Sequence, residues 1–433
     1  NATPYHQPRP YPVDHRNMQV LKDELDRQES MGIIEKVHVP TDWCMPMFPR
    51  DKKDGTIRTV HDFRWLNRAI RRKVHTMPKI DDIVLSIREY EYLTKIDISM
   101  QYYAFWLDEE SSWYCVFSTP FGKYKLNRLA MGCVQSADIA QAAMEEVFRD
   151  ILHAVKVYMD DIMFHHMSWE EHLQMIDEVL RRLLEFGFTV NPLKCEWAVG
   201  ETDFLGYWIT KQGVKPWEKR IEPILKMAEP NTLKELRRFT GMINWYRPMY
   251  KKRAEVLAPL TDMTKVPKQA FKKHWGPKAK EAFKQAKAMV AQDVLLSHPD
   301  PNEEFVIEAD ASDYQLGAVI KQKGRPIAYY SRKLTAPQKK YSTIEKELLA
   351  QLEMVEQFRP FLWGRRIKIL TDHKNLAFDK AKSTRVRNWR LLLEDFNPVI
   401  EYLPGVENEE ADTLSRYPMS EGPLSNDAVS EAL

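Results

Sequence analysis

Two adjacent carboxylates, Asp160 and Asp161, interrupt a stretch of the chain that otherwise favours β-structure. The β-prone runs 155–158 and 162–164 flank them, which predicts a β-hairpin with both acids at its tip. Neighbouring like charges repel, and partly burying them is unfavourable unless a cation is bound. Oxygen ligands suit Mg²⁺ or Mn²⁺, and two such ions about 4 Å apart can stabilise the attacking and leaving oxygens of a phosphoryl transfer. An Asp-Asp pair alone is more often a solvated turn, so other residues must decide.

A third acid, Asp97, lies within the β-prone stretch 91–100. A lone acid in a strand is usually paired or at an edge, but a two-metal site built on Asp160 and Asp161 would require a third carboxylate. Tyr102 follows on the turn out of that strand, where ordinary aromatic packing is the simplest explanation. The sequence therefore predicts that Asp97 joins the two acids of the hairpin.

Four more acids fall near the ends of predicted elements in the last third of the chain. The predicted order there is strand, strand, strand, helix, strand, helix, strand, helix, beginning at Phe305. Ser342 and Glu345 predict a capped start for the first helix of this region. The acids are Asp310, Glu347, Asp372 and Asp412. Each alone would be polar surface. Because sites in α/β domains assemble where strands end, the four together predict a second metal site.

Two groups of basic residues are candidates for binding phosphate. Lys52, Lys53 and Arg58 surround a hairpin turn predicted at Asp54-Gly55, and such a turn near a metal site would hold a triphosphate. The region 215–287 is predicted to be helical and is strongly basic. Its candidate contacts to nucleic acid are Arg237, Arg238, Arg247, Lys251 and Lys252. These helices could clamp a duplex backbone, and a solvated protein surface is the alternative for both groups.

The composition is that of an ordinary globular protein with enough length for about three domains. The 433 residues are 44% hydrophobic and 29% charged, and 64 basic against 62 acidic side chains give a net charge of +2. The four cysteines are far apart, which disfavours a zinc site or a disulfide framework and favours a reducing compartment. The sequence shows no membrane span and no signal peptide, so we expect a soluble protein. Because the chain begins with Asn1 rather than Met, we expect either an excised segment or a piece cut from a longer precursor.

Several short motifs, in this order along nearly the whole chain, resemble the reverse transcriptase and ribonuclease H region of a gypsy-type LTR retrotransposon polyprotein. The polymerase-like motifs are Lys53-Asp54-Gly55, Arg58, Asp62-Phe63-Arg64-Trp65-Leu66-Asn67, Ile96-Asp97-Ile98, Tyr158-Met159-Asp160-Asp161, Lys194-Cys195-Glu196 and Phe204-Leu205-Gly206. The nuclease-like motifs are Asp310-Ala311-Ser312, Glu345-Lys346-Glu347-Leu348-Leu349-Ala350, Thr371-Asp372-His373 and Ala411-Asp412-Thr413-Leu414-Ser415-Arg416.

The resemblance implies a multidomain fold of α/β and α+β type. A right-hand polymerase of fingers, palm and thumb would be followed by an RNase H-like α/β domain. We expect interleaved fingers and palm over 1–213, a basic helical thumb or connection over 214–297, the RNase H-like domain over 298–418, and a disordered tail over 419–433. The implied partners are an RNA/DNA hybrid, a DNA duplex and dNTPs. The implied location is cytoplasmic, within virus-like particles, and the chain could be a monomer or a homodimer.

The resemblance also assigns roles to the candidate residues. Asp97, Asp160 and Asp161 would hold two Mg²⁺ ions, replaceable by Mn²⁺, while a primer 3′-hydroxyl attacks the α-phosphate of a dNTP. The nucleotide-binding residues would be Lys52, Lys53, Arg58, Tyr102 and Met131. Of these, Arg58 and one of Lys52 or Lys53 would neutralise the triphosphate, and Tyr102 would crowd a ribose 2′-hydroxyl. The four acids of the last third would hold the metal ions that hydrolyse the RNA strand of a hybrid.

Some positions depart from the family pattern around the expected nucleotide pocket. Gln101 stands where the family has Gly, 130–132 is Ala-Met-Gly in place of Pro-Phe-Gly, Asp138 replaces Pro, and Tyr114 stands where Lys is common. No His lies just before Gly405, where some retroviral relatives carry one. The alternative function is a catalytically impaired remnant that only binds nucleic acid. A polymerase on DNA templates alone would not need a nuclease domain, and the seven intact acids favour an active enzyme over the remnant.

Overall fold

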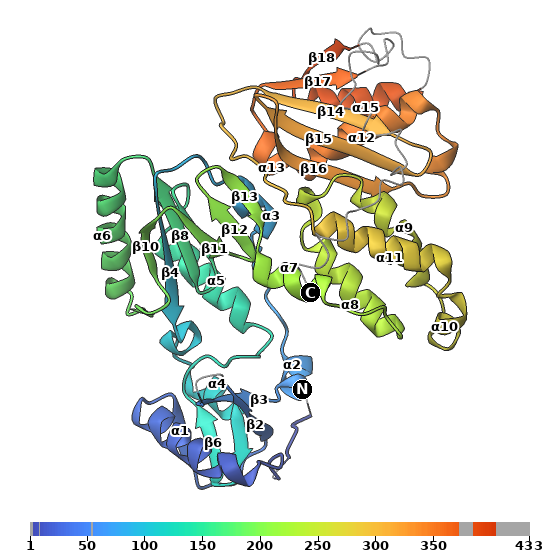
Figure 1. Cartoon of the computed structure of the whole chain (residues 1–433). Coiled ribbons are helices and arrows are strands. Elements are labelled where there is room, and N and C mark those ends of the chain that lie inside the picture. The colour runs from blue at the N-terminus through green and yellow to red at the C-terminus, as the bar shows by residue number, and fades with distance from the viewer. Residues whose placement is uncertain (1–2, 8, 53–54, 372–383, 404–433) are drawn as a thin grey trace, which may run out of the picture. The chain divides into compact units, whose positions relative to one another are not determined.

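The computed structural model describes residues 3–7, 9–52, 55–371 and 384–403. The chain forms two compact units, and neither is continuous in sequence. The first unit contains Asn1–Pro78 and Tyr90–Gly200, and the second contains Lys79–Glu89 and Glu201–Leu433. Figure 1 shows the elements of both units in the colours of the chain. Among the described residues, no helix combines the length and apolarity that crossing a lipid bilayer requires.

One sheet of the first unit is built on the hairpin predicted at Asp54-Gly55. Its strands follow in the order β1 (Ile34–Val37), β6 (Gly122–Leu126), β5 (Val116–Thr119), β2 (Met45–Asp51) and β3 (Ile57–His61). The hairpin strands β2 and β3 pair antiparallel, as predicted. The helix α1 (Met18–Ser30) buries Leu21 and Leu25 in the core of this sheet. The short helices around the sheet are η1 (His15–Asn17), α2 (Arg64–Ala69) and α4 (Glu109–Tyr114).

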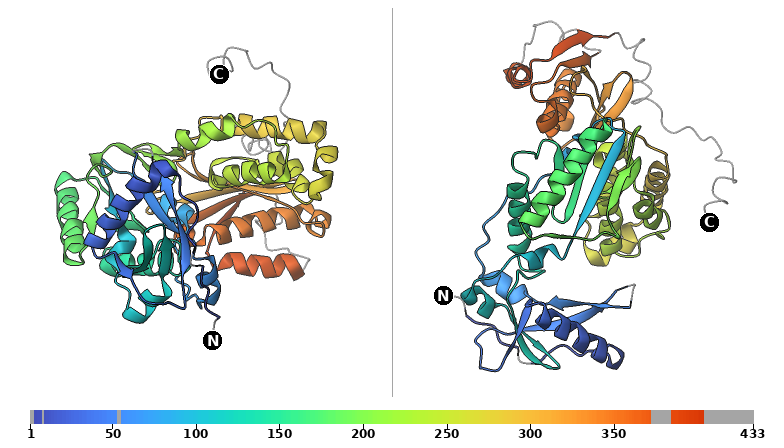
Figure 2. Two further views of the ribbon diagram at one scale, coloured as in Figure 1. Left: turned by 90° about the horizontal axis from the view of Figure 1, so that it is seen from below. Right: turned by 90° about the vertical axis from the view of Figure 1, so that its left-hand side faces the viewer.

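The other sheet of the first unit contains the predicted acidic hairpin. Its strands are β10 (Glu196–Val199), β4 (Tyr92–Ser99), β8 (Asp161–His166) and β7 (Val155–Tyr158), and β9 (Thr189–Val190) also pairs with β4. Alternate residues of these strands point into one core with the helices α5 (Ser136–Val147) and α6 (Trp169–Glu185). The helix α6 packs along β4, and the right-hand view of Figure 2 shows the two side by side. The sheet is therefore covered on the face of this core.

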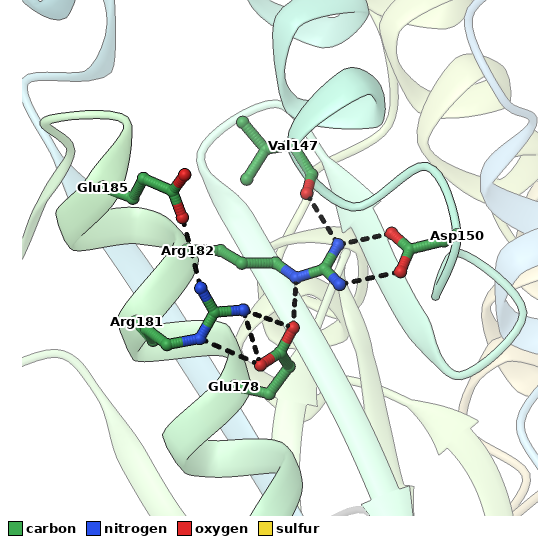
Figure 3. Close-up of polar contacts among 6 residues, drawn as sticks. All are labelled: Val147, Asp150, Glu178, Arg181, Arg182 and Glu185. Atoms are coloured by element: carbon green, nitrogen blue, oxygen red, sulfur yellow. Dashed lines mark hydrogen bonds and ion pairs between the residues drawn. The ribbon is translucent and has the colours of Figure 1, made fainter.

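An ion network joins the end of α5 to α6 (Figure 3). The Arg182 guanidinium donates to the Val147 carbonyl at 3.0 Å and pairs with the Asp150 and Glu178 carboxylates. These hydrogen bonds hold the pKa of Asp150 at about 2. Arg181, the residue before Arg182 in α6, pairs with the same Glu178 carboxylate. Because the Val147 carbonyl belongs to the last turn of α5, Arg182 fixes the end of that helix.

The second unit begins with a small sheet followed by helices. The strands β11 (Glu201–Phe204), β12 (Tyr207–Thr210) and β13 (Gly213–Pro216) pair antiparallel and form a three-stranded sheet. Its helices are α3 (Ile80–Leu85), α7 (Glu218–Leu225), α8 (Leu233–Asn244), η3 (Arg247–Met249), α9 (Arg253–Met263), η4 (Lys268–Ala270), α10 (Phe271–His274) and α11 (Pro277–Val290). The predicted helical region therefore exists, and α7, α8 and α9 each contact a neighbouring helix.

As far as residue 403, the rest of the second unit has the predicted strand and helix order, and the last predicted helix lies outside the described residues. The sheet runs β16 (Arg325–Lys333), β15 (Gln315–Gln322), β14 (Phe305–Ala311), β17 (Ile367–Thr371) and β18 (Val399–Tyr402). The strands β14, β15 and β16 pair antiparallel, whereas β17 and β18 add parallel to β14. The helices are η5 (Gln338–Lys340), α12 (Thr343–Gln357), α13 (Arg359–Leu362) and α15 (Thr384–Glu394). The Ser342 and Glu345 side chains cap α12 reciprocally, as the sequence predicts.

Candidate active sites

The backbone brings the three acids of the front half to the ends of two neighbouring strands. In the antiparallel pair β4 and β8, Asp97 lies directly opposite Asp161. The Ile98 N–H donates to the Asp160 carbonyl at 2.9 Å, so Asp160 is also joined to β4 by a backbone hydrogen bond. Opposed residues of antiparallel strands have Cβ atoms about 5 Å apart, within the reach of two carboxylates that share a cation. Asp160 itself is exposed at the tip.

A lysine contacts the innermost acid of this group. The Lys194 ammonium lies 3.1 and 3.2 Å from the two carboxylate oxygens of Asp97, whose side chain is 17% exposed. The part of the chain that the structure describes holds no cluster of three or more His, Cys, Asp or Glu side chains arranged to bind a metal ion. Gathering three carboxylates requires a cation to offset their repulsion, so a metal ion at Asp97 would compete with Lys194. The sequence reasoning did not assign this role to Lys194, although its motif was noted.

Tyr102 lies close to the acidic tip. It belongs to η2 (Gln101–Ala104), which follows β4 directly after Met100 in the left-handed conformation. Burial raises the pKa of the Tyr102 phenol, and the Asp160 carboxylate raises it further. Tyr102 is half-buried, so part of its ring remains accessible beside the carboxylates.

The predicted triphosphate-binding residues line one pocket in the first unit. The pocket measures about 360 Å³ and its walls are Arg50, Asp51, Lys52, Arg58, Thr59, Val60, His61, Met131 and Gly132. That volume is in the range of small-molecule sites. Lys52, Arg58 and Met131 thus lie together, and Lys53 falls outside the described residues. Asn67 fixes the segment that carries Met131, because its amide contacts the Gly132 carbonyl at 3.0 Å and the Val134 N–H at 2.8 Å.

His61 is a member of this pocket wall that the sequence reasoning missed. Its side chain is 6% exposed, and neither ring nitrogen has a hydrogen-bond partner among the described residues. Its ring packs edge-on against Phe117, with 4.4 Å between the centroids. Burial lowers the pKa of His61 to about 4, so the imidazole is neutral near pH 7. No sequence motif could have identified it, because its burial depends on strands that are distant in sequence.

The departures from the family pattern have partners within the first unit. Asp138 is nearly completely buried and pairs with Arg72, and Tyr114 donates to Glu110 at 2.8 Å. Gln101 is 3% exposed and donates to the backbone of the acidic tip. The side chains at these three positions therefore all make hydrogen bonds or ion pairs within the first unit.

The predicted nucleic-acid contacts of the second unit differ in their surroundings. Arg238 and Arg247 are exposed, on α8 and η3 respectively. Arg237 instead donates to the Thr264 carbonyl at 3.1 Å, which caps the end of α9. Lys251 is exposed, whereas Lys252 is half-buried and precedes α9 in the left-handed conformation. The structure thus gives Arg237 a role within the fold.

Two of the four rear acids lie in the described part of the chain. Asp310 belongs to β14, where its backbone faces Gly317 of β15. Glu347 lies in the second turn of α12, which packs on β14, and is 6% exposed. Its carboxylate accepts a hydrogen bond from the Thr371 hydroxyl at 3.4 Å. Thr371 is the last residue of β17. Asp372 and Asp412 themselves lie outside the described residues.

Two protein families match separate regions of the chain. The family described as reverse transcriptase (RNA-dependent DNA polymerase) matches residues 50–209. The family described as RNase H-like domain found in reverse transcriptase matches residues 275–369. The chain is 30% identical, over 98% of its length, to the Tf2-7 and Tf2-3 transposon polyproteins of Schizosaccharomyces pombe. It spans about a third of these relatives, 32% of their length.

Solved structures with the same fold come from foamy virus. A foamy viral protease-reverse transcriptase in complex with double-stranded DNA aligns with a TM-score of 0.79 at 23% identity, over 93% of this chain and 86% of that chain. Another, in complex with an RNA/DNA hybrid, aligns with a TM-score of 0.75 at 24% identity, over 94% of this chain and 57% of that chain. The expected multidomain fold is therefore confirmed. The chain thus contains one region similar to reverse transcriptases and one similar to the RNase H-like domain of reverse transcriptases, and it resembles the Tf2 transposon polyproteins along nearly its whole length.

Proposed function

We propose that the chain copies retrotransposon RNA into DNA as an RNA- and DNA-directed DNA polymerase, and that it degrades the RNA strand of RNA/DNA hybrids. The observation that carries the polymerase activity is the register of β4 and β8, which sets Asp97 opposite Asp161 at the strand ends that also bear Asp160. Hard carboxylate oxygens at an accessible tip fit Mg²⁺ or Mn²⁺.

Each group of residues then has a distinct task in the polymerase reaction. Bound divalent ions would activate the primer 3′-hydroxyl and stabilise the charge that develops on the phosphate oxygens. Asp97, Asp160 and Asp161 would hold those ions, and Lys194 would give up its contact with Asp97. Lys52 and Arg58, with Lys53 as a further candidate, would neutralise the triphosphate in the pocket that Met131 also lines. Tyr102 would exclude a ribose 2′-hydroxyl beside Asp160.

The nuclease reaction rests on the second unit. Asp310 and Glu347 would bind metal ions where β14 and α12 pack together, with Asp372 and Asp412 as the further ligands. When bound, these ions would supply an activated water for hydrolysis of the RNA phosphodiester. The chain would bind the hybrid and duplex that appear in the titles of the foamy viral structures. Arg238, Arg247, Lys251 and Lys252 would contact phosphates, which carry no sequence information.

The remaining proposals concern organisation and location. We propose interleaved fingers and palm over 1–213, a thumb or connection over 214–297, and a nuclease domain over 298–418. Similarity to transposon polyproteins supports a location in cytoplasmic virus-like particles. The chain would work there as a monomer or a homodimer.

Primer extension on an RNA template with Mg²⁺ tests the proposal directly. We expect Asp160→Asn to abolish extension and keep RNA cleavage, and Glu347→Gln to abolish cleavage and keep extension. Matched controls are Asp23→Asn on α1 and Glu356→Gln on α12, both exposed carboxylates outside either site. Extension by Asp160→Asn at the wild-type rate would remove the polymerase assignment. Binding of a hybrid without extension or cleavage by the unaltered chain would instead favour the catalytically impaired remnant.

A further inference from the structure

The backbone of Met159 sits at the turn between β7 and β8 in an unfavourable conformation. Its φ is 54°, in the left-handed region that residues other than glycine rarely adopt. Such a conformation persists only where the surroundings enforce it. Because Met159 directly precedes Asp160, its dihedral angles decide where the first acid of the tip points.

Two buried glutamines hold both peptide groups of Met159. The Met159 N–H donates to Oε1 of Gln141 at 2.7 Å, and its carbonyl accepts from Nε2 of Gln101 at 2.9 Å. Gln141 is fully buried and Gln101 is 3% exposed. The orientations of both amides follow from the backbone groups that they face, since an N–H requires an acceptor and a carbonyl requires a donor. We call this arrangement the Met159 clamp.

The two side chains of the clamp come from different elements. Gln101 begins η2, which directly follows the strand that carries Asp97. Gln141 lies in α5 and also donates to the Val157 carbonyl at 3.2 Å and to Glu145 at 2.8 Å. One residue of the tip is therefore fixed to both the Asp97 strand and the helix that covers the sheet.

The hydrogen-bonding capacity of the buried Gln101 amide is only partly satisfied. Its Oε1 is buried and has no hydrogen-bond partner among the described residues. A buried amide with one unsatisfied atom is destabilising compared with an apolar side chain of similar size. Gln141, by contrast, is satisfied at both ends. Retaining an amide at position 101 is therefore more readily explained by its contact with Met159 than by packing.

We propose that Gln101 and Gln141 are positioning residues that hold Asp160 in the orientation needed to share divalent ions with Asp97. The inference rests on the proposed polymerase function and adds to it two residues that act through the backbone of Met159. Metal affinity depends on such supporting contacts because a ligand that is already oriented loses less freedom when the ion binds. Loosening the clamp weakens metal binding and slows chemistry while leaving the triphosphate pocket intact.

Mn²⁺ binding to the full chain, followed by electron paramagnetic resonance, tests this inference without relying on activity. Glu347→Gln serves as the background so that the nuclease site contributes less, and the binding that Asp160→Asn removes defines the front site. We expect Gln101→Leu and Gln141→Leu each to weaken front-site Mn²⁺ binding about fivefold, the effect of losing one ordinary hydrogen bond. The double variant is expected to lose less than the product of the two, because both contacts fix one residue.

Gln135→Leu is the matched control. Gln135 makes the same two-way contact to a backbone, but to Lys73, with hydrogen bonds of 2.7 and 2.6 Å. We expect it to leave Mn²⁺ affinity unchanged. In steady-state extension by chains with an intact Glu347, the clamp variants should lower kcat and raise the Mg²⁺ requirement with little change in KM for dNTP. RNA cleavage by these same chains reports whether the second unit remains folded.

The outcomes separate the two levels of the argument. Wild-type Mn²⁺ affinity in both clamp variants overturns the positioning role, and full extension by Asp160→Asn overturns the polymerase function instead. If Gln141→Leu fails to fold, Gln101→Leu decides alone, because it replaces an amide that is only half satisfied. An equal loss of affinity in Gln135→Leu would also overturn the inference, since it would reveal general destabilisation.

Discussion

The Arg72 guanidinium donates hydrogen bonds to both carboxylate oxygens of Asp138, at 2.7 and 3.0 Å, although Asp138 is buried near the start of α5. The same carboxylate accepts the His75 N–H at 3.0 Å. These contacts fasten the basic segment after α2 to the helix that carries Gln141. Asp138, a departure from the family pattern, thus has a structural role through its pairing with an arginine.

Replacing Asp138 by Asn should destabilise the first unit. The Arg72 hydrogen bonds hold the pKa of Asp138 below its usual range, so its contribution is present above the unfolded pKa and lost as pH falls through the folded value. Urea unfolding should therefore show a lower midpoint for Asp138→Asn at pH 7, and a smaller difference at pH 3. Asp23→Asn, which alters an exposed carboxylate on α1, should show neither effect. An unchanged midpoint would mean that the buried pair contributes no net stability.

His61→Phe should flatten the loss of stability on acidification. The folded pKa of about 4 lies below the ordinary histidine value of 6.5, so the unfolded state binds the proton first and stability falls as pH drops from 6.5 to 4. A full shift of this size corresponds to about 3 kcal/mol. The free energy of unfolding of the variant should decline less across this window by up to that amount, measured by urea titration at pH 7 and pH 4.5. Parallel curves for the two proteins would contradict the assignment.

Arg58→Gln should raise KM for dNTP much more than it lowers kcat. A charge-assisted hydrogen bond to phosphate contributes about 1.5–3 kcal/mol, which corresponds to roughly 10- to 150-fold in KM. Steady-state primer extension with varied dNTP measures this directly. Arg149→Gln, an exposed arginine paired with Glu146 outside the pocket, is the matched control. A KM within twofold of the wild-type value would remove Arg58 from the nucleotide site.

Tyr102→Ala should relax discrimination against ribonucleotides. The phenol lies close enough to Asp160 for the carboxylate to raise its pKa, which places the ring beside the acidic tip. Removing a steric block should raise kcat/KM for rNTP relative to dNTP by about tenfold or more. Tyr103→Phe is the control, because the Tyr103 hydroxyl interacts with Thr59 on β3 instead. Unaltered selectivity in Tyr102→Ala would show that another side chain excludes the 2′-hydroxyl.

Arg238→Gln should weaken hybrid binding uniformly across sequences. Each phosphate contact that is lost reduces the slope of log Kobs against log salt by about one. Fluorescence anisotropy at several salt concentrations gives that slope. Arg237→Gln should leave the slope unchanged and lower thermal stability, because Arg237 donates to the Thr264 carbonyl. If Arg237→Gln instead lowered the salt slope and Arg238→Gln lowered thermal stability, Arg237 would be the phosphate contact and Arg238 the structural residue.

Local patterns in the sequence were sufficient for the elements and for the approximate placement of the acids. The alternation around Asp160 and Asp161 predicted the hairpin, and the capping residues Ser342 and Glu345 predicted the start of the helix that carries Glu347. Such signals act within a few residues, so they survive without knowledge of tertiary contacts. The roles of these acids stay predictions until they are tested.

The supporting contacts could not be predicted because they join residues far apart in sequence. Lys194 reaches Asp97 across 97 positions, Arg72 reaches Asp138 across 66, and Gln101 reaches Met159 across 58. Nothing in the local pattern of a buried glutamine distinguishes a backbone clamp from packing. The domain boundary at 213 also stays a prediction. No local sequence signal revealed that residues 79–89 belong to the same compact unit as the residues after 200.

The placement of α3 affects the order in which the protein can fold as it is synthesised. Ile83, Val84 and Leu85 are buried in the second unit, where Leu85 joins the core around Phe305. The ribosome therefore releases this apolar turn more than a hundred residues before the chain that will cover it. A nascent or truncated polypeptide ending near residue 200 would expose this apolar turn to water, where a chaperone could bind it. Expression of the front half alone should consequently favour aggregation unless these side chains are replaced by polar ones.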